Sequence, residues 1–186
     1  MKRLLAIFGL GLAATGAHAE HVDVNLSNDV LRGVYAAPFP RMNGIFEIGG
    51  MLGESHGEKF QMAHAAMLVT GDAGARDANV NAGLGGRVFV LNAEDVDGGG
   101  LALGGTIDAR LPAFNRLGVV AYAYGAPDAS LFGDFDGYYE YAVSFDYKVL
   151  QTASVYLGWR QLKVDVDGAG TATVDTGFHF GLRLNF

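Results

Sequence analysis

The 186-residue sequence contains no cysteine, and this absence excludes disulfide bonds, thiolate chemistry and lipid attachment through a cysteine. Basic residues are also few: 13 Lys and Arg stand against 20 Asp and Glu, which gives a net charge of −7. Phosphate recognition needs clustered Lys and Arg. We therefore expect no nucleic-acid partner.

Long hydrophobic runs are missing as well, although half of the residues are hydrophobic. A membrane-spanning helix needs roughly 20 apolar residues, and the longest uncharged run after residue 19, at 60–71, contains Gln61 and His64. No segment after residue 19 has the 3.6-residue period of an amphipathic helix. The apolar residues must then belong to strands, either in a soluble β-sandwich or in a membrane β-barrel.

The first 19 residues have the pattern of a secretory signal peptide. Lys2 and Arg3 precede a short apolar run at 4–14, and Ala17 and Ala19 form a small-x-small cleavage site. The alternative, an N-terminal membrane anchor, would need a longer run. We expect cleavage after Ala19, which divides the chain into a signal peptide at 1–19 and one domain at 20–186. Without the two basic residues the net charge becomes −9.

The last segment shows the strand pattern most clearly, because apolar and polar residues alternate along it with a period of two. Its apolar positions form one stripe of five residues: Phe178, Phe180, Leu182, Leu184 and Phe186. Such a stripe needs an apolar solvent, and lipid is the obvious one. An alternating strand closed by Phe resembles the C-terminal assembly signal of bacterial outer-membrane β-barrels. We expect these residues to face lipid and to direct assembly.

The same alternation predicts ten strands, at 22–26, 31–36, 44–52, 60–70, 79–90, 101–111, 117–124, 139–149, 155–166 and 175–186. A two-residue turn at 28–29 would pair Leu26 with Leu31, Val24 with Gly33 and Val22 with Tyr35. The two faces of 60–70 cannot be separated. Bacterial single-chain barrels have an even strand number, so ten is expected, and eight is the alternative if the first hairpin lies outside the barrel.

Two features favour a transmembrane antiparallel up-and-down β-barrel over a sandwich. Small residues are frequent on the polar faces, which suits a narrow lumen; they are Gly83, Gly85, Ala102, Gly104, Gly158 and Gly181. Aromatic residues gather near strand ends, like the girdles at membrane interfaces; they are Tyr138, Tyr139, Tyr147, Trp159, Phe178 and Phe186. The fold class is therefore all-β, and the expected location is the bacterial outer membrane.

Charged residues of both signs occupy the predicted lumen face of neighbouring strands: Arg87, Asp108, Arg110, Glu140, Asp146, Arg160 and Arg183. An unpaired charge in a narrow lumen is costly, so pairing is expected. Arg183 is expected to pair with Glu140 or Asp146. The favoured interpretation is a structural barrel whose lumen is filled by paired charges. The alternative is a narrow channel for ions or small solutes.

An ordered set of motifs runs through segments 22–29, 82–87, 101–105, 110–112, 126–128, 156–160 and 181–186. In these segments the sequence resembles the YfaZ family of proteobacterial outer-membrane proteins. The resemblance implies an outer-membrane barrel of largely uncharacterised function, with no catalytic or ligand residues to carry over.

Candidate catalytic residues are few. Some small barrels act as enzymes on lipid, and a resemblance to a lipid A deacylase barrel would place a serine two residues from a histidine near the C-terminal strand. Here the residue two positions after His179 is Gly181, so the nucleophile is missing. Ser55 and His56, between Glu54 and Glu58, lie in a loop without pre-organised geometry. A lipid-modifying enzyme is therefore the least favoured function, and we expect no enzymatic activity.

We also expect no cofactor and no metal. The acidic loops match no defined calcium loop, and solvated loop tips are favoured over a Ca²⁺ or Mg²⁺ site shared with lipopolysaccharide phosphates. Those loops carry Glu94, Asp95 and Asp97; Asp128, Asp134 and Asp136; and Asp165 and Asp167. The expected partners are outer-membrane lipids and lipopolysaccharide, with periplasmic chaperones and the barrel assembly machinery during biogenesis.

Overall fold

The structure is a computed structural model that describes residues 20–39, 41–55, 57–74, 79–93 and 96–186. The expected signal peptide at 1–19 lies outside these residues, as do His56, Glu94 and Asp95. Within the described ranges, no helix is long and apolar enough to cross a membrane.

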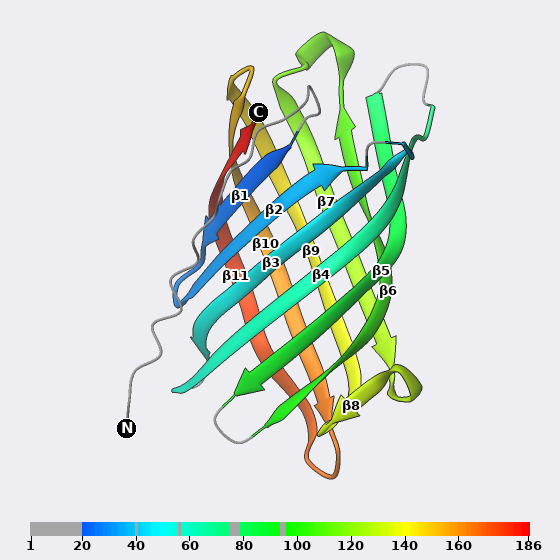
Figure 1. The fold of residues 1–186 in the computed structure, drawn as a ribbon. Coiled ribbons are helices and arrows are strands. Elements are labelled where there is room, and N and C mark those ends of the chain that lie inside the picture. Colours follow the sequence, from blue (N-terminus) through cyan, green and yellow to red (C-terminus); the bar gives the residue numbers. More distant parts are fainter. Residues whose placement is uncertain (1–19, 40, 56, 75–78, 94–95) are drawn as a thin grey trace.

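One antiparallel sheet closes on itself to form the barrel (Figure 1). Its ten long strands pair in chain order, and β1 pairs with β11 to close the ring. They are β1 (His21–Leu26), β2 (Val30–Pro38), β3 (Gly44–Ser55), β4 (Glu58–Asp72), β5 (Asn79–Ala93), β6 (Asp97–Arg110), β7 (Leu117–Pro127), β9 (Phe135–Leu150), β10 (Ala153–Val166) and β11 (Gly170–Asn185). The prediction of a ten-stranded up-and-down barrel is confirmed, and the β-sandwich alternative is wrong.

The first hairpin has the predicted register. Leu26 lies opposite Leu31, Val24 opposite Gly33 and Val22 opposite Tyr35. Because β1 also pairs with β11, this hairpin belongs to the barrel, which rules out the eight-stranded alternative.

Several strands extend further than their hydrophobic pattern predicted. Pro38, which lies between the predicted strands at 31–36 and 44–52, stands opposite Ile45 in the β2–β3 ladder. Between the predicted strands at 117–124 and 139–149, Pro127 lies opposite Gly137. The connection there folds into a 3₁₀ turn (η2, Asp128–Ser130) and the short strand β8 (Leu131–Gly133). These extensions contain Pro38, Gly125, Pro127, Asp136 and Gly137, which interrupt the apolar–polar alternation, so the pattern does not mark the strand there.

The two ends of the barrel differ. We call the end where Phe186 N donates a hydrogen bond to Glu20 O the terminus end, and the opposite end the β8 end (Figure 1). Strand β8 pairs with residues 98–100 of β6, whereas β7 pairs with residues 103–110 of β6. β8 therefore extends the wall of the barrel beyond β7.

The outer surface carries an apolar belt. All five predicted lipid-facing residues lie on it, four of them in β11 and Phe186 directly after that strand. Phe178 is 72% exposed, and Phe180, Leu182, Leu184 and Phe186 also face outward. The faces of β4 are now resolved: its inner face carries Phe60, Met62, His64, Ala66 and Leu68. One girdle assignment is wrong, because Tyr138 is fully buried inside the barrel.

Candidate functional site

The centre of the lumen is organised around Glu140 on β9. Its Oε2 accepts a hydrogen bond from Arg87 Nη1 at 2.5 Å and another from the Tyr138 hydroxyl at 2.5 Å, and its Oε1 accepts one from the Tyr122 hydroxyl at 2.7 Å. Both Arg87 and Glu140 are 1% exposed. A buried carboxylate with three charge-assisted or hydroxyl donors is fully compensated for its loss of water.

Aromatic rings surround the guanidinium of Arg87. Its central carbon lies 3.6 Å from the centroid of the Tyr124 ring and 5.7 Å from that of Tyr122. Arg32 on β2 approaches the Tyr122 ring from 5.3 Å. A cation over a tyrosine face is attracted by the ring quadrupole, and this attraction strengthens where water is excluded.

A second set of polar residues bridges β11, β10 and β1. Arg160 donates from Nε to Asp175 Oδ2 at 2.6 Å and from Nη1 to Asn25 Oδ1 at 2.9 Å. The Tyr156 hydroxyl accepts from Asn25 Nδ2 at 3.0 Å and donates to Asp23 Oδ1 at 2.5 Å. The network therefore spans the seam at which the barrel closes.

The seam itself carries an ion pair. Arg183 Nη2 and Nε each lie 3.1 Å from Asp23 Oδ2. The two residues are direct partners in the β1–β11 ladder. The expectation that Arg183 would pair with Glu140 or Asp146 is wrong, because β11 meets β1 and the two expected partners are held by other arginines.

Asp146 is held by Arg110 at the terminus end. Arg110 Nη1 lies 2.5 Å from Asp146 Oδ1, and its Nε lies 3.2 Å from Asp108 Oδ1. Arg110 is on β6 and Asp146 on β9, which do not pair with each other at these residues; Gly118 of β7 lies between them in register.

Three such contacts span an intervening glycine, and we call these positions glycine gaps: Gly118, Gly158 and Gly181. A Cβ at Gly118 would lie 2.9 Å from the Arg110 guanidinium. At Gly158 it would lie 2.3 Å from Ser144 Oγ, which is 3.2 Å from His179 Nε2. At Gly181 it would lie 2.2 Å from the Tyr156 ring. Each gap gives a large side chain room to reach the strand beyond its neighbour.

An apolar layer fills the lumen toward the β8 end. The rings of Phe89 and Tyr138 stack with centroids 4.0 Å apart. The layer consists of these two and of Val30, Met51, Phe60, Met62, Leu91, Ala102, Tyr124, Ala126, Phe135, Leu162, Val164 and Val174. The expectation of a lumen filled by charges alone is therefore incomplete: the lumen has a charged layer and an apolar layer.

The structure brings all seven predicted lumen residues into ion pairs, in four groups. Arg87 joins Glu140; Arg110 joins Asp108 and Asp146; Arg160 joins Asp175; and Arg183 joins Asp23. Hydrogen bonds of Asn25 and Tyr156 link the last two groups. Sequence reasoning missed Asp23, Asn25, Arg32, Glu47, His64 and Asp175. All but His64 alternate with predicted outer residues, so the period-two pattern could have found them.

A bulge explains how two consecutive residues of β11 turn inward. Leu162 lies opposite Asp175 and Lys163 opposite Thr173, which leaves Val174 as the extra residue. Val174 joins the apolar layer and Asp175 the polar network. Such a bulge re-aims side chains without breaking the sheet.

The possible catalytic groups and metal ligands among the described residues include serine, histidine and carboxylate side chains. Ser144 and His179 are in contact, but both are buried in the lumen. Ser55 Oγ donates to Thr173 O at 3.0 Å. Within the described ranges, no group of three or more His, Asp or Glu could hold a metal ion.

Comparison with known proteins gives a family and several structures. The profile of the family described as "YfaZ precursor" matches residues 2–186, and no curated protein matches the sequence. The structure of KdgM porin is 10% identical in sequence, with a TM-score of 0.39, and the match covers 90% of this chain and 99% of that chain. The structure of KdgM porin in complex with disordered oligogalacturonate is 9% identical, with a TM-score of 0.39, and the match again covers 90% of this chain and 99% of that chain. A chain from "Unveiling the Mechanism Behind the in-meso Crystallization of Membrane Proteins" has 10% identity and a TM-score of 0.42 over 91% and 83%.

Proposed function

Because the chain belongs to the YfaZ family and folds as a closed ten-stranded barrel with an apolar belt, we propose that it is a structural barrel of the bacterial outer membrane with a closed lumen. The single observation that carries this proposal is the buried Arg87–Glu140 pair beneath the apolar layer. A ten-stranded barrel is close to the size at which side chains fill the interior.

Full burial of large side chains across the lumen supports the closed state. Arg87, Arg160, Tyr138, Met51, Leu162 and Glu140 are each less than 2% exposed. An ion crossing the barrel would have to displace the Phe89–Tyr138 stack and then pass a paired arginine. The enclosed charges hold non-neighbouring strands together, which is a structural role.

Conductance in planar lipid bilayers tests the proposal. The natural protein, shown to be folded by its heat-dependent gel mobility, is expected to give a silent bilayer. The variant Phe89→Ala/Tyr138→Ala/Arg87→Ala/Glu140→Ala removes both the stacked rings and the ion pair, and it is expected to open discrete conductance steps. Phe145→Ala, on the lipid-facing side of β9, is the matched control and should stay silent. Stable steps from the natural protein would overturn the closed-lumen proposal.

A narrow channel is the second candidate, and one observation favours it. Several lumen nitrogens are buried without a hydrogen-bond partner, namely Arg32 Nε, Arg87 Nε, Arg160 Nη2 and His64 Nε2. Groups of this kind commonly bind buried water, and a file of waters would be the start of a polar path. Steps that vanish in Arg32→Met but persist in Phe145→Ala would favour this function.

A further inference from the structure

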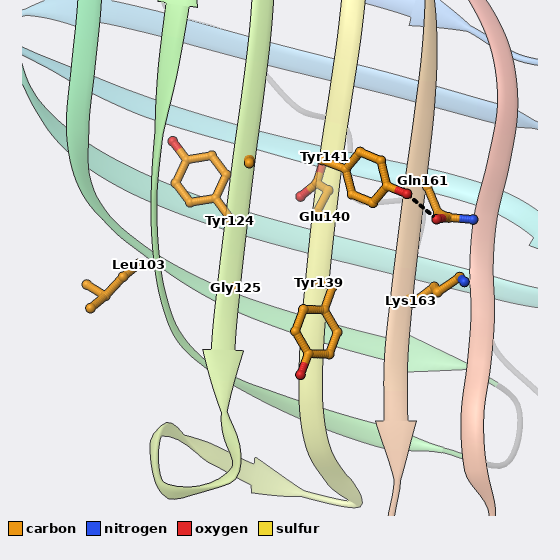
Figure 2. Close-up of a pocket in the computed structure, with 9 residues that line it drawn as sticks. Leu103, Tyr124, Gly125, Tyr139, Glu140, Tyr141, Gln161 and Lys163 are labelled. Carbon is orange, nitrogen blue, oxygen red and sulfur yellow. Dashed lines mark hydrogen bonds between the residues drawn. The ribbon is translucent and has the colours of Figure 1, made fainter.

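A groove runs along the outside of the barrel over β7. Figure 2 shows Gly125 at its floor, with the side chains of Leu103 and Tyr139 on either side. Ala123, two residues earlier on β7, also lines the groove. The register explains its shape, because Gly125 lies between Leu103 of β6 and Tyr139 of β9. Its volume is about 700 Å³.

The outward side chains of β7, the strand beneath the groove, become smaller toward the β8 end. The outward residues of β7 run Leu117, Val119, Ala121, Ala123, Gly125. Neighbouring strands are about 4.8 Å apart, so the walls on β6 and β9 stand roughly 10 Å apart over this floor. That width matches one or two extended hydrocarbon chains lying along the barrel.

The wall of the groove that β9 and β10 form carries both polar and aromatic side chains. The Tyr141 hydroxyl donates to Gln161 Oε1 at 2.5 Å (Figure 2), and the Tyr141 ring lies 5.6 Å from the Trp159 ring. Lys163 lies directly opposite Tyr139 in the β9–β10 ladder. Along β10 the outward residues change from Val155, Leu157 and Trp159 to Gln161 and Lys163, which marks the border between apolar belt and aqueous side.

Outer-membrane barrels have short periplasmic turns and longer extracellular connections. The connection between β7 and β9, which holds η2 and β8, lies at the β8 end, so this end belongs on the extracellular side. We propose that this groove binds one lipopolysaccharide molecule of the outer leaflet, with an acyl chain over Ala123 and Gly125 and a lipid phosphate at Lys163. Lys163 is the one cation among the described residues that line the groove. A phosphorylated, saturated lipid can place its anion at Lys163 and its chains over the small residues. The inference rests on the outer-membrane placement but not on whether the lumen conducts.

Lipid binding to the purified, folded protein in detergent tests this assignment. The probe is diphosphoryl lipid A, followed by native mass spectrometry and by the fluorescence of Trp159, which is the one tryptophan of the chain. Phosphatidylcholine with saturated chains and inorganic pyrophosphate are the comparison probes, because one lacks net charge and the other lacks chains. We expect a single lipid A to remain bound where neither comparison probe does.

Two substitutions separate the parts of the groove. Lys163→Gln should weaken lipid A binding about fivefold, the effect expected for one lysine at an anionic lipid surface. Gly125→Leu should abolish it by filling the floor, where a Cβ would meet nothing closer than 3.8 Å and folding is therefore preserved. Gly33→Leu, at an outward position with nothing within 4 Å, is the control and should bind as the natural protein does.

Three results would overturn the assignment. The first is equal retention of lipid A and phosphatidylcholine, and the second is equal behaviour of Gly125→Leu and Gly33→Leu. The third is a dimer that forms in the natural protein and is lost in Gly125→Leu, which would assign the groove to a second copy. Because Lys163→Gln alters only an outer side chain, it decides the matter even if Gly125→Leu does not fold. Bilayer conductance is independent of all these readouts, so failure here leaves the closed-lumen proposal standing.

Discussion

Arg87 and Glu140 lie on β5 and β9, strands that do not pair with each other, yet Arg87 Nη1 is 2.5 Å from Glu140 Oε2. Two strands, β6 and β7, separate them along the wall. The ion pair therefore acts across the lumen rather than along the sheet. It joins parts of the barrel that the backbone hydrogen bonds connect only indirectly.

Breaking this pair should destabilise the barrel strongly. Arg87→Ala leaves Glu140 buried and uncompensated, and removal of one partner of a buried pair costs about 3–5 kcal/mol. Urea unfolding in lipid vesicles, followed through Trp159, measures the loss. The double variant Arg87→Met/Glu140→Leu should recover most of it, because both charges are gone. A double variant no more stable than Arg87→Ala would contradict the assigned role of the pair.

The glycine gaps should not tolerate even a methyl group. In Gly158→Ala the new Cβ would lie 2.3 Å from Ser144 Oγ and 2.6 Å from His179 Nε2. Overpacking of this kind costs about 1–3 kcal/mol, and we expect a lower temperature for the heat-dependent gel shift. Gly33→Ala, which meets nothing within 4 Å, is the control. Equal shift temperatures for the two variants would refute the steric argument.

The closure seam should weaken when its ion pair is removed. Arg183→Ala leaves Asp23 with only its hydrogen bonds from Tyr156 and Asn25, and loss of a hydrogen-bonded charge costs about 1–3 kcal/mol. Hydrogen exchange should then rise in β1 and β11 and not in β5. Uniform protection across all three strands would show that the pair does not hold the seam.

The outward stripe of β11 is proposed as the segment recognised during assembly. Phe186→Ser should impair insertion into the outer membrane more than any loop substitution does, because it removes an exposed aromatic from that stripe. Fractionation of cells and the heat-dependent gel shift measure insertion, with Asp167→Ser as the loop control. Normal amounts of folded, membrane-inserted Phe186→Ser would remove the main support for this role.

Alternation of residue types predicted the strands and the lumen face of Arg87 and Glu140, because a period of two is a local property of each strand. The choice of a barrel over a sandwich rested on the small lumen residues and the aromatic strand ends. The count of ten rested on the even strand number of bacterial barrels, and the register of the first hairpin on the turn at 28–29. The pattern of alternation had one clear failure. It failed along β4, where Phe60 and Met62 face inward while Met67 and Val69 face outward. Both faces of that strand are apolar, so alternation cannot distinguish its inner face from its outer face.

The partners of the lumen charges could not be predicted from the sequence. Arg183 pairs with Asp23, its direct partner in the ladder that closes the barrel, and this depends on the register of β1 against β11. The bulge at Val174 depends on the β10–β11 register, which no local pattern specifies. The apolar layer at the β8 end combines residues from most strands, and its members are individually unremarkable in sequence.

The glycine gaps have a mechanical consequence. Backbone hydrogen bonds tie each strand only to its two neighbours, so a barrel held by them alone could be pulled apart one hairpin at a time. Contacts over Gly118, Gly158 and Gly181 tie a strand to the next but one. Extracting β9, β10 or β11 under force would thus load three strands together, and the barrel should yield as one cooperative unit.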